Sequence, residues 1–419
     1  MKKNEKFISR REFIEKSSLS VAVVSAVGPA RLFDKKINFL DLSQNKMITR
    51  SLGNTGLKLP IVSFGVMNAD NPNVVQHAID RGIKLLDTAW SYQRGRNEEM
   101  IGNVLKKNKK RKDIIIVSKV PHPAIRKRNN KKVSKLADSR AIKKEFIDKF
   151  NQSLRRLQTD YIDILCQHKA VTRDLVNSEP IMEALSQLKK EGKIRFTAFS
   201  THSNQDVVID EAIKSKFYEV IVVALNYRTR KRKEIKDAIA RAVKAGIGII
   251  AMKTQAGGYL DRREARRKRI KPTKPVNHKA CLKWVLQDKN ITTAIPGCTT
   301  FEQIDELLEV AYNLELTDKE KRFIETTENM SGEFNCQGCG KCRETCPKNV
   351  DIPSIMRTYM YTFAYNNLEH AHITYEDIPE EFNLSNCDDC EEKCAVKCVN
   401  GLNVSSDLSI MRYVFKNIA

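Results

Sequence analysis

Eight of the eleven cysteines lie close to the C-terminal end, in two groups whose spacing is typical of metal-cluster ligands. The first group reads Cys336-x2-Cys339-x2-Cys342-x3-Cys346 and is followed by Pro347. This spacing strongly indicates a [4Fe–4S] ligand loop, in which three thiolates bind one cubane and the fourth begins a helix. A zinc site, which prefers paired CxxC units, is the alternative.

The second group reads Cys387-x2-Cys390-x3-Cys394-x3-Cys398, with one extra residue and no proline after it. Together with a predicted helix at 353–371 between the groups, it resembles ferredoxin-type dicluster domains, which implies two [4Fe–4S] clusters. By that resemblance Cys346 would bind iron with the second group and Cys398 with the first. One cluster plus structural or zinc-bound cysteines is the alternative. The other cysteines, Cys166, Cys281 and Cys298, are interpreted as small buried residues.

Four acid–base residues lie at or just after the ends of predicted strands: Asp87, Tyr92, Lys119 and His168. Carbonyl reduction needs a hydride from a cofactor and a proton for the developing alkoxide. A tyrosine can donate that proton if a neighbouring lysine lowers its pKa. Aspartate would hold the lysine, and histidine would orient the substrate carbonyl.

Eight alternating strands and helices are the elements that must bring these residues together. Apolar, β-branched runs predict strands at 61–66, 84–89, 113–120, 161–168, 194–201, 219–226, 247–254 and 291–297. Helices lie between them, such as 140–157 with its apolar stripe. This pattern predicts an α/β chain, a (β/α)8 TIM barrel followed by a small, mainly helical iron–sulfur domain. An open doubly wound sheet is less favoured because no Gly-rich fingerprint follows an early strand.

Residues 47–315 resemble the aldo-keto reductase family. The resemblance rests on the following segments: RSLGNTG (50–56), LDTAWSY (86–92), NEEMIG (97–102), Ser118-Lys119 and DILCQH (163–168). It implies the catalytic tetrad Asp87, Tyr92, Lys119 and His168, with Tyr92 as proton donor. Trp90 would be either a substrate-stacking wall or a packing residue.

The same resemblance implies NADP(H) or NAD(H) binding across the barrel mouth. The implied contacts are Ser200, Gly297, Thr299, Thr300 and Gln303. The chain departs from the family pattern at Thr201 (usually Asn), Val222 (Gln) and Met252 (Tyr). Gly297 and Gln303 stand where the family has the Lys and Arg for the 2′-phosphate. The choice between NAD and NADP therefore stays open.

The first thirty residues resemble a twin-arginine (Tat) export signal, because Arg10-Arg11 precede a short apolar stretch ending near Ala30. A periplasmic location is expected, because that pathway carries folded, cofactor-loaded proteins; a basic N-terminus of a cytoplasmic protein is the alternative. The net charge is +23, with basic runs at 126–135, 228–233 and 262–271. They suggest an anionic substrate or an acidic electron partner, but plain solvated loops on a basic protein are the favoured interpretation. No nucleic-acid motif and no membrane-spanning run is found.

The predicted organisation is a signal segment at 1–30, a barrel at 47–315, a connecting helix and linker at 316–335, and a dicluster domain at 336–419. The predicted function is an oxidoreductase that transfers hydride at a carbonyl or alcohol carbon of a small molecule such as a sugar, with electrons relayed through the clusters. Either a tightly bound nucleotide is recycled, or the clusters connect the substrate to an external electron partner. An electron-transfer or redox-sensing protein with a non-catalytic barrel is the alternative.

Overall fold

The computed structural model describes residues 46–123, 138–256, 276–327, 336–388, 390, 394 and 396–417. Residues 47–419 form one compact unit. The predicted export segment at 1–30, the linker at 331–335 and the basic runs at 126–135 and 262–271 lie outside the described residues. No described helix has both the length and the apolar character that a membrane crossing requires.

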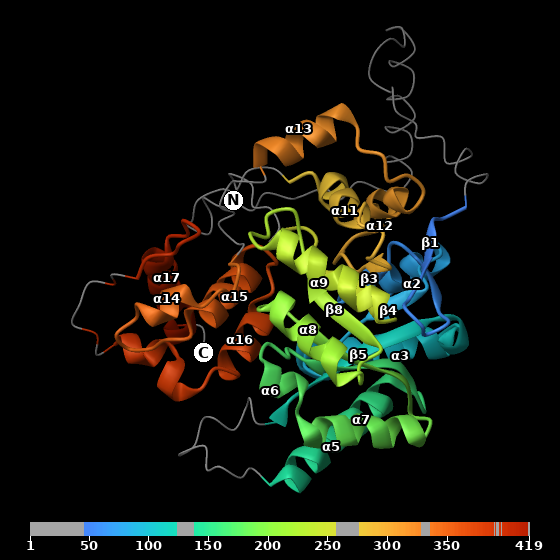
Figure 1. Ribbon diagram of the computed structural model, residues 1–419, viewed down its shortest axis with the longest axis horizontal. Helices are drawn as coiled ribbons and strands as arrows, with labels where there is room; N and C mark the ends of the chain where they lie inside the picture. The colour runs from blue at the N-terminus through green and yellow to red at the C-terminus, as the bar shows by residue number, and fades with distance from the viewer. Residues whose placement is uncertain are drawn as a thin grey trace, which may run out of the picture. The chain divides into compact units, whose positions relative to one another are not determined.

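A parallel sheet of eight strands forms the centre of the chain, with the strands in sequence order (Figure 1). The strands are β3 (Phe64–Gly65), β4 (Leu85–Asp87), β5 (Ile115–Pro121), β6 (Ile162–His168), β7 (Ile194–Thr201), β8 (Val220–Ala224), β9 (Gly248–Met252) and β10 (Thr293–Ala294). Parallel bridges Val62–Ala294 and Gly65–Gly297 join the first strand to the last, which closes the sheet into a barrel. The predicted (β/α)8 architecture is confirmed, although the strands are shorter at several ends. An antiparallel hairpin of β1 (Thr49–Ser51) and β2 (Lys58–Pro60) precedes the barrel.

Helices follow the strands and cover the outer face of the sheet (Figure 1). They are α2 (Pro72–Asp80), α3 (Arg96–Lys107), α5 (Ser139–Leu157), α6 (Arg173–Val176), α7 (Glu179–Lys190), α8 (Gln205–Ser215), α9 (Arg232–Lys244), α11 (His278–Leu286), α12 (Phe301–Leu308) and α13 (Asp318–Thr327). Local sequence sets their bounds. Asp138 caps α5 by accepting from the Arg140 N–H, and Gln158 ends it in a left-handed conformation.

Burial explains the near-continuous apolar strands. Every residue of β6, β8 and β9 is buried, because the strands face side chains inside the barrel and helices outside it. The inner cluster includes Val117, Ile164, Cys166, Val220 and Ile250. Cys166, Cys281 and Cys298 are buried, as predicted.

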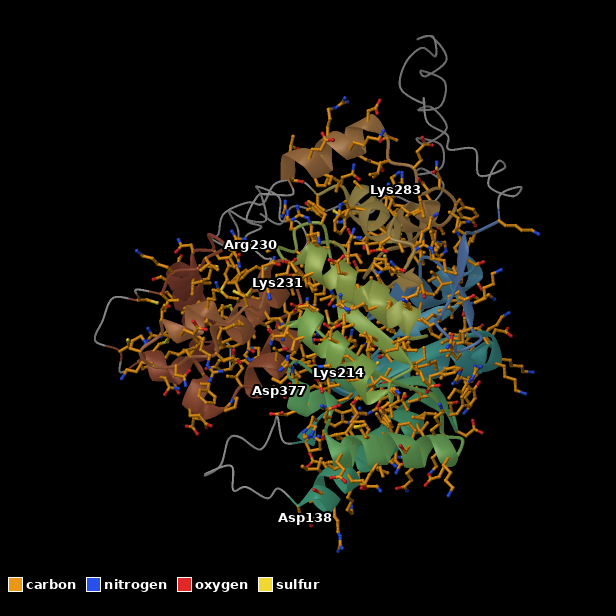
Figure 2. The ribbon with its side chains drawn as sticks, viewed as in Figure 1. Asp138, Lys214, Arg230, Lys231, Lys283 and Asp377 are labelled. Atoms are coloured by element: carbon orange, nitrogen blue, oxygen red, sulfur yellow. The ribbon has the colours of Figure 1, made fainter. Side chains whose placement is uncertain are left out.

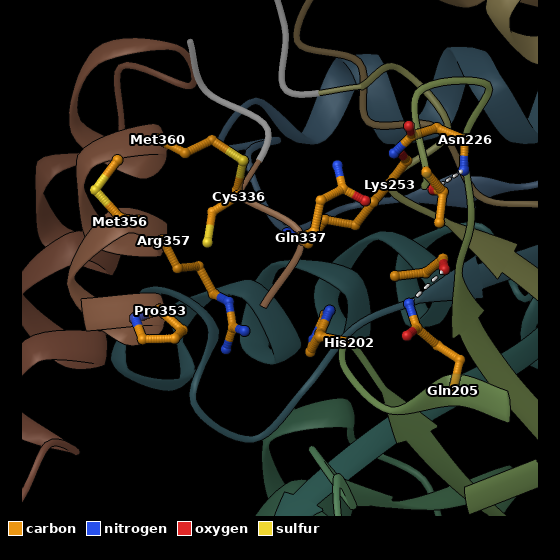
Figure 3. A pocket seen from close by; sticks show the side chains of 12 residues that line it. His202, Gln205, Asn226, Lys253, Cys336, Gln337, Pro353, Met356, Arg357 and Met360 are labelled. Atoms are coloured by element: carbon orange, nitrogen blue, oxygen red, sulfur yellow. Dashed lines mark hydrogen bonds between the residues drawn. The ribbon is translucent and has the colours of Figure 1, made fainter. Parts of the chain in front are cut away.

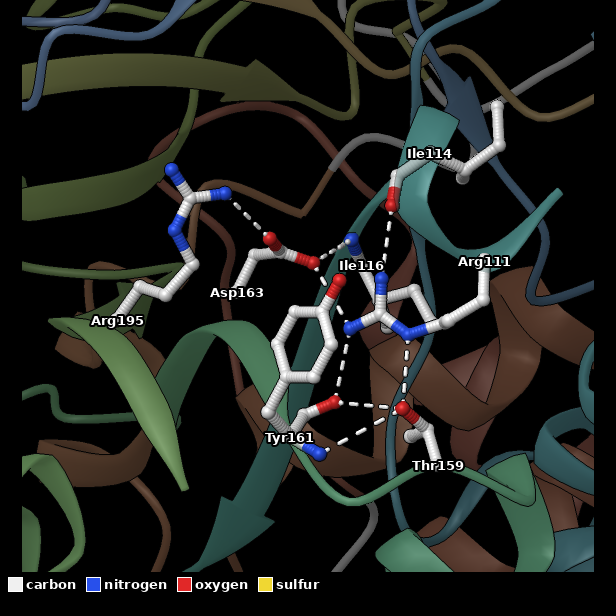
Figure 4. A network of polar contacts seen from close by, with 7 residues as sticks. All are labelled: Arg111, Ile114, Ile116, Thr159, Tyr161, Asp163 and Arg195. Carbon is white, nitrogen blue, oxygen red and sulfur yellow. Dashed lines mark hydrogen bonds and ion pairs between the residues drawn. The ribbon is translucent and has the colours of Figure 1, made fainter. Parts of the chain in front are cut away.

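A buried ion-pair network ties strand starts together (Figure 4). The Asp163 carboxylate, 2% exposed, accepts from Arg111 Nη2 at 3.0 Å and from Arg195 Nη1 at 2.8 Å. It also accepts from the Ile116 N–H at 3.0 Å, so β5, β6 and β7 share one anion. The network lies at the amino ends of the strands, the face that stabilises such barrels rather than the face that carries chemistry.

Helix α13 belongs to the barrel rather than acting as a free connector. Lys283 of α11 donates to Glu320 of α13 at 2.9 Å, and both side chains are at most one-tenth exposed. Ile324 packs in an apolar cluster with Tyr227 and Cys281. The segment predicted as a connecting helix therefore extends the barrel's outer layer.

The C-terminal residues form α14 (Lys341–Glu344), α15 (Ile352–Phe363), α16 (Leu368–Glu376) and α17 (Val404–Asn417). These helices enclose an apolar core of their own, which includes Ile355, Met356 and Met411. The prediction of a single helix at 353–371 is wrong, because the helix is interrupted between α15 and α16. Asn366 adopts a left-handed conformation there, and Asn367 caps α16 by accepting from the His370 N–H.

Polar contacts hold the C-terminal region on the barrel. Arg230, in the loop after β8, donates to the Val399 carbonyl at 3.1 Å (Figure 2). Arg94 pairs with Glu376 at 3.1 Å. Gly338 lies so near the barrel that a Cβ atom there would be 2.3 Å from Ser203 Oγ. The basic run at 228–233 is thus partly engaged in this contact, which weakens its interpretation as a bare positive surface.

Candidate functional site

The four predicted acid–base residues meet at the carboxyl ends of adjacent strands. Asp87 ends β4, Lys119 lies in β5, His168 ends β6, and Tyr92 begins the 3-10 turn η2 (Tyr92–Gly95) after β4. Asp87, Tyr92 and His168 line one cavity of about 350 Å³. Lys119 is buried behind them, 1% exposed. The cavity volume is in the usual range of small-molecule sites.

Lys119 and Asp87 form a buried ion pair. Lys119 Nζ donates to Asp87 Oδ1 at 2.5 Å and to the Thr88 carbonyl at 2.7 Å. Burial raises the pKa of Asp87, while the Lys119 ammonium opposes that rise. Asp87 Oδ2 is buried without a hydrogen-bond partner among the described residues. Asp87, which lines the cavity, can therefore accept a further hydrogen bond.

Tyr92 lies between the lysine and the histidine. Lys119 Nζ is 5.2 Å from the centroid of the Tyr92 ring, and the His168 ring centroid is 6.1 Å away at a steep angle. The sequence predicts a lowered pKa for Tyr92, and this is wrong. Burial raises the pKa of Tyr92 well above its usual range, and the nearby Asp87 carboxylate raises it further.

His168 is a neutral imidazole in this setting. Burial lowers its pKa well below the usual range, and the nearby cations Lys169 and Lys119 lower it further. Neutral histidine can donate one hydrogen bond and accept another. The site therefore presents a protonated phenol and a neutral imidazole to the same cavity.

Residues of the C-terminal region complete the cavity, and these were missed from the sequence. His370 of α16 contacts Tyr92 edge-on, with ring centroids 5.4 Å apart, and Tyr361 of α15 contacts His370 at 4.5 Å. Lys253, just after β9, donates to the Tyr361 hydroxyl at 3.3 Å. The strand-end rule could have found Lys253. No periodic pattern in the sequence marks His370 or Tyr361 as site residues, because they reach the cavity only through the packing of the C-terminal region against the barrel.

The predicted nucleotide contacts divide into two sets. Gly297, Thr299 and Gln303 line the cavity, and the Thr299 N–H donates to Gln303 Oε1 at 2.8 Å. Ser200 is not part of the cavity lining and accepts from the Lys169 N–H at 3.1 Å. Thr300 is not part of it either and caps α12.

Other residues near the site also divide into those that line the cavity and those that do not. Met252 lines the cavity, whereas Val222 lies in the barrel core. The Thr201 hydroxyl donates to the Ser203 carbonyl at 2.9 Å. Trp90 is a packing residue and lines no part of the cavity, because its indole N–H donates to Gln152 Oε1 at 3.0 Å and Lys149 lies over its ring.

Each cysteine group has one member of the other group nearby. Burial raises the pKa of Cys336 to about 11, and the nearby thiols of Cys398 and Cys339 add to the rise. Burial raises the pKa of Cys342 to about 12, again with Cys336, Cys339 and Cys398 nearby. Cys398 is thus close to the first group.

Cys346 is correspondingly close to the second group. Burial raises the pKa of Cys387 to about 11, and Cys346, Cys394 and Cys390 contribute to the rise. Within the described ranges, no three His, Cys, Asp or Glu side chains are arranged to hold a metal ion.

Comparison with known proteins gives consistent matches to one family. The family model described as "Aldo/keto reductase family" matches residues 63–280. The uncharacterized oxidoreductase YqkF of Bacillus subtilis is 28% identical over 308 residues, covering 67% of this chain and 96% of the relative. Versiconal hemiacetal acetate reductase of Aspergillus parasiticus is 27% identical over 248 residues, covering 52% of this chain and 71% of the relative. Among solved structures, the holo form of aldo-keto reductase AKR11C1 from Bacillus halodurans matches with a TM-score of 0.52 and 26% identity, covering 67% of this chain and 96% of that one.

Proposed function

Because this chain belongs to the aldo/keto reductase family of oxidoreductases, we propose that it reduces a small aldehyde or ketone, or oxidises the matching alcohol, with Tyr92 as the proton donor. One observation carries the proposal. The buried pair of Lys119 and Asp87, 2.5 Å apart, lies behind Tyr92 at the carboxyl ends of the strands, where barrels of this kind carry their chemistry.

The proton step follows from the protonation states of the site. The raised pKa of Tyr92 keeps its phenol protonated in neutral solution, as a donor to an alkoxide must be. Neutral His168 can donate a hydrogen bond to the substrate oxygen and so fix the carbonyl beside Tyr92. The low dielectric of the buried site strengthens these contacts.

A nicotinamide nucleotide is the proposed hydride source. Gly297, Thr299 and Gln303 support this, because they line the same cavity as Tyr92 and precede or begin α12, whose N-terminal N–H groups favour a phosphate. Ser200 supports it less, because its hydroxyl already accepts from the Lys169 N–H. When bound, the nucleotide supplies or accepts the hydride.

Two [4Fe–4S] clusters are proposed for the C-terminal region. Cys336, Cys339, Cys342 and Cys398 would hold one, and Cys346, Cys387, Cys390 and Cys394 the other. The mutual influence of these thiols on their pKa values supports both sets. When bound, such clusters accept and release single electrons, which suits exchange with an external electron partner.

Tat-dependent export to the periplasm is proposed from the sequence alone. Arg10-Arg11, the following apolar stretch and the need to load clusters before export support it. A fusion of residues 1–46 to a reporter that is active only outside the cytoplasm tests the proposal. Replacing both arginines by lysine should abolish reporter activity, and unchanged activity would refute Tat export.

The catalytic proposal is tested on the anaerobically purified full chain. NADPH or NADH oxidation is followed with a panel of small aldehydes and ketones, and Tyr92→Phe is compared with Tyr413→Phe, which changes an exposed tyrosine. Tyr92→Phe should lower kcat/KM by about 100-fold or more while the absorbance near 400 nm is retained. Equal activity in Tyr92→Phe would refute the proton-donor role.

A second candidate function is electron transfer or redox sensing with a non-catalytic barrel. The close thiol groups favour it. Dithionite-reversible bleaching of the visible band, with no carbonyl turnover by the wild type under any nucleotide, would favour this function over the first.

A further inference from the structure

A second, smaller cavity of about 60 Å³ adjoins the catalytic cavity (Figure 3). His202 and Lys253 line both, so the two spaces are neighbours. The C-terminal region contributes Cys336, Met356 and Arg357 to the smaller one. A water needs about 10–15 Å³, so this space holds several waters or one carboxylate group.

Two cations face this pocket without a carboxylate to balance them. The Arg357 guanidinium points into the space between the C-terminal helix and the barrel (Figure 3). Among the residues that the structure describes, the Arg357 guanidinium has no hydrogen-bond acceptor and no ion-pair partner. Lys253 donates only to the Tyr361 hydroxyl, and the residues that line the pocket include no Asp or Glu.

The charge of these cations reaches both cavities. Burial lowers the pKa of His202 well below its usual range, and Arg357 and Lys253 lower it further. Burial would raise the pKa of Tyr361, but Lys253, Arg357 and Lys169 outweigh it and lower that pKa. Like charges facing one half-buried space repel each other, and an anion between them would offset the repulsion. His202 Nδ1 is also buried without a partner.

We propose that this pocket is an anion subsite for a carboxylate or similar oxyanion on the carbonyl substrate, with Arg357 as the main donor and Lys253 as the second. The inference rests on the proposed function, since it places the carbonyl beside Tyr92 and His168 and the anionic group beside Arg357. The substrate class is therefore an oxo acid or an aldehyde with an acidic substituent. The C-terminal region thereby sets substrate specificity as well as carrying the cysteines.

A matched pair of ligands tests the subsite. 4-Carboxybenzaldehyde and 4-nitrobenzaldehyde have nearly the same shape, but only the first is an anion. Calorimetric titration of the anaerobic full chain, without nucleotide so that no turnover occurs, gives the affinity of each. The acid should bind about 10- to 100-fold more tightly, as expected for a charge-assisted contact with arginine.

Three variants separate the charge from the fold. Arg357→Gln should remove most of the preference for 4-carboxybenzaldehyde over 4-nitrobenzaldehyde, and Arg357→Lys should retain part of that preference. Lys253→Met should weaken the same preference independently of Arg357. Iron content and the visible spectrum verify that each variant is loaded. Equal affinities in the wild type, or full preference in both Arg357→Gln and Lys253→Met, would overturn the subsite.

The same titrations distinguish other sources of the anion. If Arg357→Gln weakens NADP⁺ relative to NAD⁺ and leaves the aldehyde preference intact, the oxyanion is the cofactor's phosphate and the substrate assignment falls. If the variant changes only the iron content or the cluster potential, Arg357 balances cluster charge and the subsite is refuted. If the acid is preferred through Arg357 but neither aldehyde is reduced with nucleotide, the subsite stands and the proposed reductase function fails.

Discussion

The imidazole of His370 lies edge-on against the phenol ring of Tyr92, with ring centroids 5.4 Å apart. Tyr92 belongs to the barrel, and His370 belongs to α16 of the C-terminal region. Tyr361, Ala364 and Tyr365 line the same cavity from that region. The C-terminal helices therefore form a wall of the cavity that Tyr92 lines, and substitutions there should change the binding of a carbonyl substrate.

His370→Phe should weaken carbonyl binding about tenfold with little loss of stability. His370 is 3% exposed, and its Nδ1 atom has no partner among the described residues, so a substrate oxygen or bound water can satisfy it. Phenylalanine retains the ring contacts with Tyr92 and Tyr361 but loses this polar atom. KM and the thermal midpoint are measured together, with the exposed Tyr413→Phe as a control. An unchanged KM would remove His370 from the list of substrate contacts.

Lys119→Met should destabilise the fold by about 3–5 kcal/mol, because it leaves the Asp87 carboxylate buried without its cation. The double variant Asp87→Asn/Lys119→Met should recover much of that stability, since no isolated charge remains. It should not recover activity, because the site has lost the charges behind Tyr92. Urea unfolding and kcat/KM are measured on all three variants. A double variant less stable than Lys119→Met would contradict the account of the pair.

Carbonyl reduction should be nearly independent of pH from about 6 to about 9, apart from any dependence of the substrate itself. The pKa of Tyr92 is raised well above 10.0, so the phenol stays protonated, and the pKa of His168 is lowered well below 6.5, so the imidazole stays neutral. Alcohol oxidation needs the phenolate and should rise steadily with pH over the same range. Initial rates in both directions check this. A fall in kcat/KM for reduction centred near neutral pH would mean that His168 titrates there.

Asp163→Asn should lower the free energy of unfolding by about 3 kcal/mol and leave kcat/KM within about twofold. The carboxylate is buried between Arg111 and Arg195 at the amino ends of the strands, so its loss leaves both cations without their shared anion. Denaturant unfolding and steady-state rates provide the measurements, and Asp80→Asn on the exposed end of α2 is the control. A large loss of activity at full stability would show that this network reaches the site.

The barrel and its acid–base residues could be predicted from sequence because both follow local rules. Strands such as β6 and β9 are buried on both faces, so their apolar runs are continuous, and Asp87 and His168 end the strands on which they were expected. The paired Lys119 and Asp87 follow from adjacent strands in sequence order.

The protonation of Tyr92 and the C-terminal wall could not be predicted in this way. The Tyr92 pKa depends on the burial of its side chain and on the nearness of Asp87, which follow from side-chain packing. His370 and Tyr361 reach the cavity because a turn at Asn366 between α15 and α16 directs α16 toward the barrel. No periodic pattern in the sequence predicts that packing.

Single serine substitutions should sort the eight C-terminal cysteines into two sets that do not follow their order in the sequence. Cys398→Ser should cause the same change as Cys336→Ser, because Cys398 lies near the first group. Cys346→Ser should match Cys387→Ser, because Cys346 lies near the second. Iron and acid-labile sulfide per chain, together with electron paramagnetic resonance of the reduced protein, identify which cluster is lost. Cys298→Ser, a change in the barrel, is the control and should lose no iron. If Cys398→Ser instead shares its spectrum with Cys387→Ser, each cluster is bound by four consecutive cysteines and the crosswise assignment is wrong.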